Sequence, residues 1–336
     1  MPSNEAADRL RNSGIDLGQG EAIRYNLYDT LASRGDLEAL FNVLISFKDH
    51  RSRHPVFTAV SVVANPDFKK IEEANFEKYY WEPFTETLDR YGLGDAFATW
   101  KKGEQEKLFW PEFHGREHLN VLAWQRALLH RDKHTMAAFK ERFWGFANSH
   151  PTNINYQAAF DVEQPLDIAI QEKIIEEGLQ LFEQLHGRKA RFFVPPNGPF
   201  NNKLEEVASR HGIEYMSASK IQKEPQGFGK TKIRLHYLGQ RNNMNQRYIT
   251  RNCFFEPSDP GRDWVETCLN DIAIAFKWLK PAVISSHRVN YIGGLQLSNR
   301  ENGLKKLNIL LNGIIKKWPN VEFLTSVQLG DAIVNH

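Results

Sequence analysis

The segment Leu108–Val121 reads LFWPEFHGREHLNV. Its first six residues, Leu108–Phe113, are rich in apolar side chains and are typical of a buried strand. Two histidines four residues apart, His114 and His118, follow at once, and a helical pattern of apolar residues comes next. A strand that ends in polar side chains and leads into a helix is the repeating unit of a parallel α/β sheet.

The same alternation of strand and helix patterns runs through most of the chain. We therefore expect one α/β domain over residues 1–336, with a parallel sheet closed or nearly closed into a barrel. The helix that begins the pattern, Asp36–Lys48, has Asp36 as its expected N-cap. Further strands are predicted at Pro55–Val63, Ala190–Val194, Lys232–Leu238, Tyr248–Phe255, Pro281–Ser286 and Val321–Leu324, and further helices at Glu117–Leu129, Thr135–Ala147, Asp167–Leu185, Trp264–Trp278, Asn302–Trp318 and from Val327.

Four polar residues stand directly after predicted strands: Asn65, His114, Asn197 and His287. In a barrel of parallel strands, the carboxyl ends of the strands lie at one rim, and sites form there. We therefore expect these side chains to gather around one opening.

The bulk properties limit the classes of partner. The 336 residues carry a net charge of +2, which gives no electrostatic basis for binding nucleic acid or an anionic membrane. Two cysteines without CxxC spacing, no apolar leader segment and no long apolar run predict a soluble cytoplasmic protein. The oligomeric state is not specified by these properties.

His114 and His118 are candidate ligands of a divalent metal ion. On a helical turn, two residues four apart share one face and can direct one ring nitrogen each at the same ion. The competing interpretation makes His118 a core or capping residue and His114 an ordinary loop residue. A carboxylate that could serve as the third metal ligand, beside the two histidines, is not evident near the motif.

The same residues also match H-x-x-E-H, the inverted zincin pattern, in which Glu117 would be the general base of a metallopeptidase. That pattern requires a helix carrying all three side chains. Pro111 and Gly115 disfavour such a helix, so we expect a helix to begin no earlier than the motif.

Three segments together give a more specific signal: FHGREHLN (113–120), VPPNG (194–198) and SSHRVNYIG (285–293). With them, the chain resembles the polysaccharide deacetylase (NodB-homology) family, and more closely a bacterial branch of deacetylase-like proteins with these segments. The resemblance extends from about Asp29 to the C-terminus. It implies a deformed barrel of about seven strands and hydrolysis of acetyl groups from a carbohydrate.

The resemblance also implies roles for particular residues. His114 and His118 match the two histidines that bind a divalent metal, most plausibly Zn²⁺, and His287 matches the histidine that acts as general acid. Arg116, Arg288, Asn65, Asn197 and Asn290 are expected to contact substrate. The ion would lower the pKa of a bound water and polarise the acetyl carbonyl.

The family's adjacent aspartate pair, which ends its first strand, has no counterpart here, because no Asp-Asp pair occurs in the chain. Asp29 follows Ala22–Tyr28, a poor candidate for a buried strand, and is expected to be a surface cap. We therefore expect a barrel without its first strand, and either a shortened enzyme or a homologue without deacetylase activity. The alternative function is a carbohydrate-binding protein without turnover.

Overall fold

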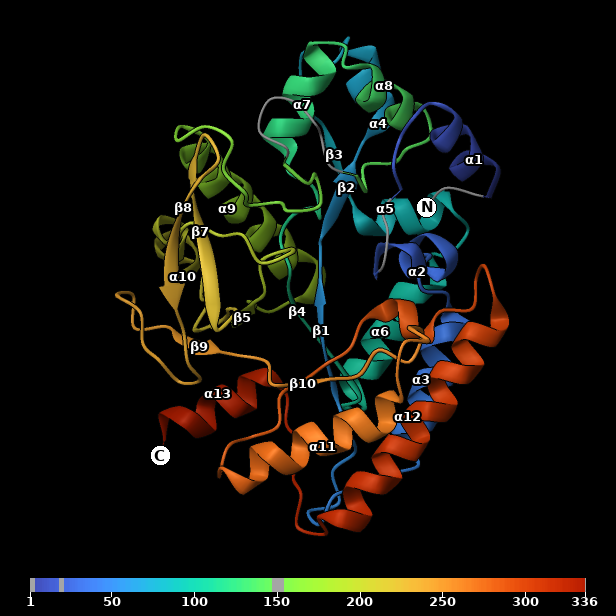
Figure 1. Cartoon of the computed structure of the whole chain (residues 1–336), viewed down its shortest axis with the longest axis vertical. Coiled ribbons are helices and arrows are strands. Elements are labelled where there is room, and N and C mark those ends of the chain that lie inside the picture. Colours follow the sequence, from blue (N-terminus) through green and yellow to red (C-terminus); the bar gives the residue numbers. More distant parts are fainter. Residues whose placement is uncertain (1–3, 18–20, 147–153, 336) are drawn as a thin grey trace.

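The computed structural model describes residues 4–17, 21–146 and 154–335 and has a five-stranded parallel sheet at its centre (Figure 1). The strands occur in the order β1 (Phe57–Ser61), β4 (Phe109–Phe113), β5 (Phe192–Phe193), β6 (Tyr215–Ser217) and β9 (Arg247–Ile249). Every pair of neighbours is parallel. The predicted α/β class with a parallel sheet is confirmed.

The sheet is not closed into a barrel by the described residues. A separate parallel pair, β10 (Cys253–Phe254) and β11 (Ile284–Ser285), continues the chain beyond β9. On the side away from β4, no strand of the described chain pairs with β1, and all five β1 residues remain partly exposed. The described sheet is therefore open along one side of β1.

The prediction of a strand at Val321–Leu324 is wrong. This segment is irregular because groups outside the sheet bind its backbone. The Phe323 amide donates to the Asp49 carboxylate at 3.0 Å, and the Val321 carbonyl lies 3.0 Å from Nδ1 of His50. A short apolar run predicts burial but does not by itself predict pairing.

Two antiparallel pairs lie outside the five-stranded sheet, β2 (Ala64–Pro66) with β3 (Trp81–Pro83) and the hairpin β7 (Ile221–Gly227) with β8 (Lys230–Leu235). The helices are α1 (Asn4–Asn12), α2 (Glu21–Tyr28), α3 (Arg34–Ile45), α4 (Phe68–Glu73), α5 (Phe84–Arg90), α6 (Asp95–Gln105), α7 (Val121–Leu129), α8 (Lys133–Lys140), α9 (Asp167–His186), α10 (Glu205–Arg210), α11 (Trp264–Lys277), α12 (Leu297–Lys317) and α13 (Ser326–Val334), with 3₁₀ turns η1 (Asn202–Leu204) and η2 (Arg288–Tyr291). Helices lie on both sides of β1 and β4 in Figure 1, with α9 and α10 to one side and α3, α6 and α12 to the other.

Two local predictions near the N-terminus need correction. The N-cap of α3 is Ser33 and not Asp36, which occupies the third helical position and completes a capping box with Ser33. The run Ala22–Tyr28, a poor candidate for a buried strand, lies within helix α2. Asp29, expected at the surface, is only 8% exposed.

The packing of α9 against the sheet fixes the position of the histidine motif. Phe182 of α9 packs with Phe113 and Phe193 in one buried cluster. At Gly178, an added Cβ would lie 2.8 Å from the Phe113 ring and 3.0 Å from Cβ of Arg116. The helix can approach the end of β4 this closely because residue 178 has no side chain.

No helix among the described residues is both long enough and apolar enough to span a bilayer.

Candidate functional site

The histidine motif lies in a loop between β4 and α7. Asn120 caps α7 by accepting a hydrogen bond from the Ala123 amide at 3.2 Å, so the helix begins at Val121 and not at Glu117 as predicted. Gly115 has φ of +112°, and a Cβ there would meet the Glu117 carbonyl at 3.3 Å. The loop therefore turns sharply between the two histidines, and the expectation that they share a helical face is wrong.

The loop nevertheless brings the two imidazoles together. The centres of the His114 and His118 rings are 5.1 Å apart, with an interplanar angle of 64°. Nδ1 of His114 lies 2.6 Å from the Val194 carbonyl, to which it donates, so Nε2 carries the lone pair. Nδ1 of His118 is buried and makes no hydrogen bond within the described chain.

Burial keeps both imidazoles neutral. Burial, together with a smaller contribution from the neighbouring His118, lowers the pKa of His114 to about 3. Burial also lowers the pKa of His118 to about 4, with a smaller contribution from the charge of Arg288. A neutral imidazole is the form that binds a metal ion.

The third histidine, His287, follows β11 and is held by a carboxylate. Its Nδ1 lies 2.5 Å from Oε1 of Glu256, and its ring meets the edge of Tyr25 with centres 6.0 Å apart. Glu256 stands two residues beyond β10, which pairs with β11. The parallel pair therefore places the acid and the imidazole side by side at its carboxyl end.

Glu256 is in turn held by a buried polar network. Its Oε2 accepts hydrogen bonds from Arg24 of α2 at 2.6 Å and from Asn290 at 2.9 Å. Burial opposes ionisation of this carboxyl, but the bonds from His287 and Asn290 and the charge of Arg24 outweigh burial and lower its pKa. Glu256 is therefore an anion that fixes the orientation of the His287 ring.

All three histidines line one cavity of about 2380 Å³. The cavity is lined by residues of β1, by residues 281–289 and by residues 291 and 292, among others. The charge of His287 is one of the causes that lower the pKa of His114, as expected for groups facing the same space. The convergence of the strand ends predicted from the sequence is thus present, and the role of each histidine remains a prediction.

The residues expected to contact substrate fall into two groups. Asn65, Asn197 and Arg288 line the cavity. Asn65 donates to Thr87 Oγ1 at 3.1 Å, and Asn197 is exposed with φ of +54°. Arg288 forms a two-pronged ion pair with the buried Asp29, at 2.7 and 3.1 Å.

Two other members of that set do not face the cavity. Asn290 is fully buried, and it supports Glu256 and accepts from Ser258 Oγ at 2.7 Å. Arg116 is 4% exposed, pairs with Glu117 at 2.6 Å and with Glu177, and does not line the cavity. Both act within the protein, because a buried polar group must be satisfied by its neighbours.

The structure adds two residues that sequence reasoning did not place in the site. Glu256 had a usable signal, since it follows the apolar run CFF at the end of a predicted strand. Arg251 lines the cavity, and its Nη1 donates to Ser285 Oγ at 2.9 Å. Its charge contributes to lowering the pKa of His114.

The histidine pair fits two positions of a metal site. Zinc–nitrogen bonds of about 2.1 Å at a tetrahedral angle place two bound imidazole centres roughly 5 Å apart, which agrees with the observed separation. Across residues 4–17, 21–146 and 154–335, however, no group of three His, Cys, Asp or Glu side chains is arranged to hold an ion. Within these residues, no third side chain of these types is placed beside the histidine pair to complete a site.

The arrangement differs from that of an inverted zincin. The helix that such a site requires begins only after the motif, at Val121. Glu117 is 1% exposed and is bound by Arg116 and by the Tyr79 hydroxyl at 3.1 Å. The carboxylate is therefore held away from the cavity instead of facing an ion between the histidines.

No family model matches the sequence, and no curated protein matches it. Among solved structures, the chain is similar to the α-amylase AmyC from Thermotoga maritima (TM-score 0.41, 9% identity, 73% of this chain and 53% of that one). It is also similar to a probable polysaccharide deacetylase from Pseudomonas aeruginosa PAO1 (0.29, 16%, 51% and 55%) and to the allantoinase PuuE (0.30, 18%, 50% and 54%). The chain spans about half the length of these proteins, and similarities of this size assign neither a family nor a function.

Proposed function

We propose that this protein is a hydrolase of the deacetylase type that acts on an acetylated carbohydrate. The observation that carries the proposal is that His114, His118 and His287 line a single cavity although they come from distant parts of the chain. The resemblance of the three sequence segments to polysaccharide deacetylases supplies the substrate class. The large, partly polar cavity is compatible with a saccharide.

His287 is assigned the proton transfer to the leaving group. Glu256 accepts the hydrogen bond from Nδ1, which leaves Nε2 as the nitrogen able to pass a proton to the departing amine or alcohol. In the overall reaction, water adds to the acetyl carbonyl, the protonated Nε2 gives its proton to the sugar nitrogen or oxygen as the bond to it breaks, acetate leaves, and a proton of the added water restores Nε2. Arg251 provides a positive charge that favours the developing negative charge on the acetyl oxygen.

His114 and His118 are assigned to a divalent ion, with Zn²⁺ as the proposed metal. When bound, such an ion lowers the pKa of water and polarises a carbonyl. The His114 ring is oriented for this by its bond to Val194, which leaves Nε2 as the ligating nitrogen. With two ligands from the described residues, we expect weak binding that a substrate oxygen, water or a further carboxylate would strengthen.

A second candidate function is saccharide binding without turnover. The lack of a third ligand among the described residues favours it. It predicts binding of the saccharide that is insensitive to a chelator, with no release of acetate.

The test is acetate release from chitopentaose by the full chain, in the presence of Zn²⁺ and then of a chelator. The proposal predicts release that the chelator abolishes and that His287→Ala lowers by about 10²-fold or more. His211→Ala is the matched control, because His211 directly follows the C-terminus of α10 and pairs with Glu176 outside the cavity. Chelator-insensitive binding without acetate would instead support the second candidate, and unchanged release by His287→Ala would refute the assigned role.

A further inference from the structure

A second pocket, of about 720 Å³, lies on the opposite side of β9 from the central cavity. Tyr248 of β9 lines this pocket, whereas the next residue, Ile249, lines the central cavity. Successive side chains of a strand point to opposite faces, so the sheet separates the two spaces. Because residues of the β7–β8 hairpin form one wall, we call it the hairpin pocket.

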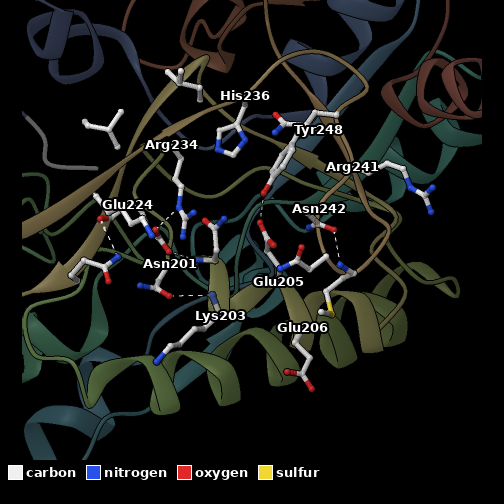
Figure 2. Close-up of a pocket in the computed structure, with 18 residues that line it drawn as sticks. Asn201, Lys203, Glu205, Glu206, Glu224, Arg234, His236, Arg241, Asn242 and Tyr248 are labelled. Atoms are coloured by element: carbon white, nitrogen blue, oxygen red, sulfur yellow. Dashed lines mark hydrogen bonds and ion pairs between the residues drawn. The ribbon is translucent and has the colours of Figure 1, made fainter.

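The floor of the hairpin pocket is polar and buried. Figure 2 shows Glu205, at the start of α10, directed at the Tyr248 hydroxyl, which donates a hydrogen bond to it. The His236 ring packs against Tyr248 with centres 4.2 Å apart. These three residues are only 5 to 7% exposed.

The opposite wall contains an ion pair whose two charges cancel. Arg234 of β8 donates a hydrogen bond to Oε2 of Glu224 at 2.7 Å, and the backbone N–H of Asn202 donates one to Oε1 at 3.1 Å. The lining as a whole has four cationic and three acidic side chains, so neither sign of charge predominates. This balance does not favour a strongly charged ligand.

Uncharged hydrogen-bonding groups dominate the rest of the lining. Six amide side chains contribute to it: Asn201, Asn202, Gln226, Gln240, Asn242 and Asn243. The side-chain oxygen of Asn202 is buried and makes no hydrogen bond within the described residues. A buried acceptor of this kind is expected to be satisfied by water or by a ligand.

Apolar side chains complete the rim. Ile233 and Leu235 of β8 are 56% and 68% exposed, and Met244 is 38% exposed. Amide and carboxyl groups at the floor, with apolar groups at the rim, match a molecule that has hydroxyls on its edges and C–H groups on its faces.

We propose that the hairpin pocket binds a neutral, hydroxyl-rich saccharide unit and thus serves as a second carbohydrate-binding site. The inference rests on the proposed function, since it extends carbohydrate recognition to a surface away from the three histidines. Burial raises the pKa of Glu205.

The test is calorimetric titration of the full chain with cellopentaose, a neutral oligosaccharide without acetyl groups. We expect wild-type protein to bind it and Glu205→Ala to bind it at least tenfold more weakly. Glu183→Ala is the matched control, because Glu183 is an exposed glutamate of α9 that lines neither the hairpin pocket nor the central cavity. The variant His287→Ala should bind cellopentaose like the wild type.

A second variant covers the case in which Glu205→Ala does not fold. Met244→Arg places a long side chain at the exposed rim, and it should also weaken binding at least tenfold. Absence of binding to the wild type, or equal binding to all of these variants, would overturn the inference. Acetate release from chitopentaose is measured on the same samples. Acetate release without cellopentaose binding would support the proposed function and refute the saccharide site in the hairpin pocket. Glu205-dependent binding without acetate release would support the saccharide site and refute the proposed function.

Discussion

The Arg24–Glu256 ion pair joins α2 to the acid that holds His287, and its disruption gives the sharpest prediction. The side chains of Arg24 and Glu256 are 5% and 6% exposed, and their atoms are 2.6 Å apart. In Glu256→Gln, the buried guanidinium loses the carboxylate that it meets at 2.6 Å. Removing one member of a buried ion pair costs about 3–5 kcal/mol in the free energy of unfolding. The glutamine amide can still make some of the hydrogen bonds, so we expect a loss of about 3 kcal/mol.

Urea unfolding followed by circular dichroism measures this loss, and Glu322→Gln is the control. Glu322 pairs with Arg53 at 2.8 Å but is 32% exposed, so its substitution should cost less than about 1 kcal/mol. Arg24→Met combined with Glu256→Gln should cost less than the sum of the single changes, by about 1 kcal/mol or more. A loss below 1 kcal/mol for Glu256→Gln, or strict additivity, would refute the buried network.

Four further outcomes follow from the same contacts. The lowered pKa of Glu256 contributes stability to the folded state. This stability is present above the ordinary glutamate pKa of about 4.3 and is lost as the pH falls through the lower pKa of the folded state. The urea midpoint of Glu256→Gln should therefore fall less on acidification than that of the wild type. Gly178→Ala should cost about 1–3 kcal/mol in urea unfolding, because the methyl group meets Phe113, and a neutral effect would contradict the close helix packing. Calorimetry with Zn²⁺ should show weak binding that His118→Ala removes; tight binding of one equivalent would mean that a third ligand exists. Asn290→Ala should lower acetate release about tenfold by loosening Glu256, with little change in KM, and an equal effect on KM would contradict a positioning role.

The α/β class was predictable because hydrophobic periodicity directly reflects burial. The strand at β4 and the long helices α9, α11 and α12 occur where the apolar pattern places them, within a few residues. The secondary-structure predictions fail where tertiary contacts override the local conformational preference of the sequence. Val321–Leu324 has a strand-like composition, yet Asp49 and His50 bind its backbone.

The site was predictable in its histidines and less so in its polar supports. Strand-end positions placed His114 and His287 at one opening, because parallel strands share the direction of their carboxyl ends. Whether a polar residue faces a cavity or a neighbour depends on contacts across the chain. Arg116 and Asn290 therefore could not be separated from Arg288 by sequence alone. The bond between Glu256 and His287 depends on the pairing of β10 with β11.

The central claim is that the imidazoles of His114 and His118 face the same space as His287. Zinc-soaked crystals measured on both sides of the zinc absorption edge test it most directly. We expect an anomalous peak within about 2.1 Å of one nitrogen of each of His114 and His118, on the wall of the cavity that His287 also lines. A peak elsewhere, or histidines that bind zinc on a surface turned away from His287, would contradict it.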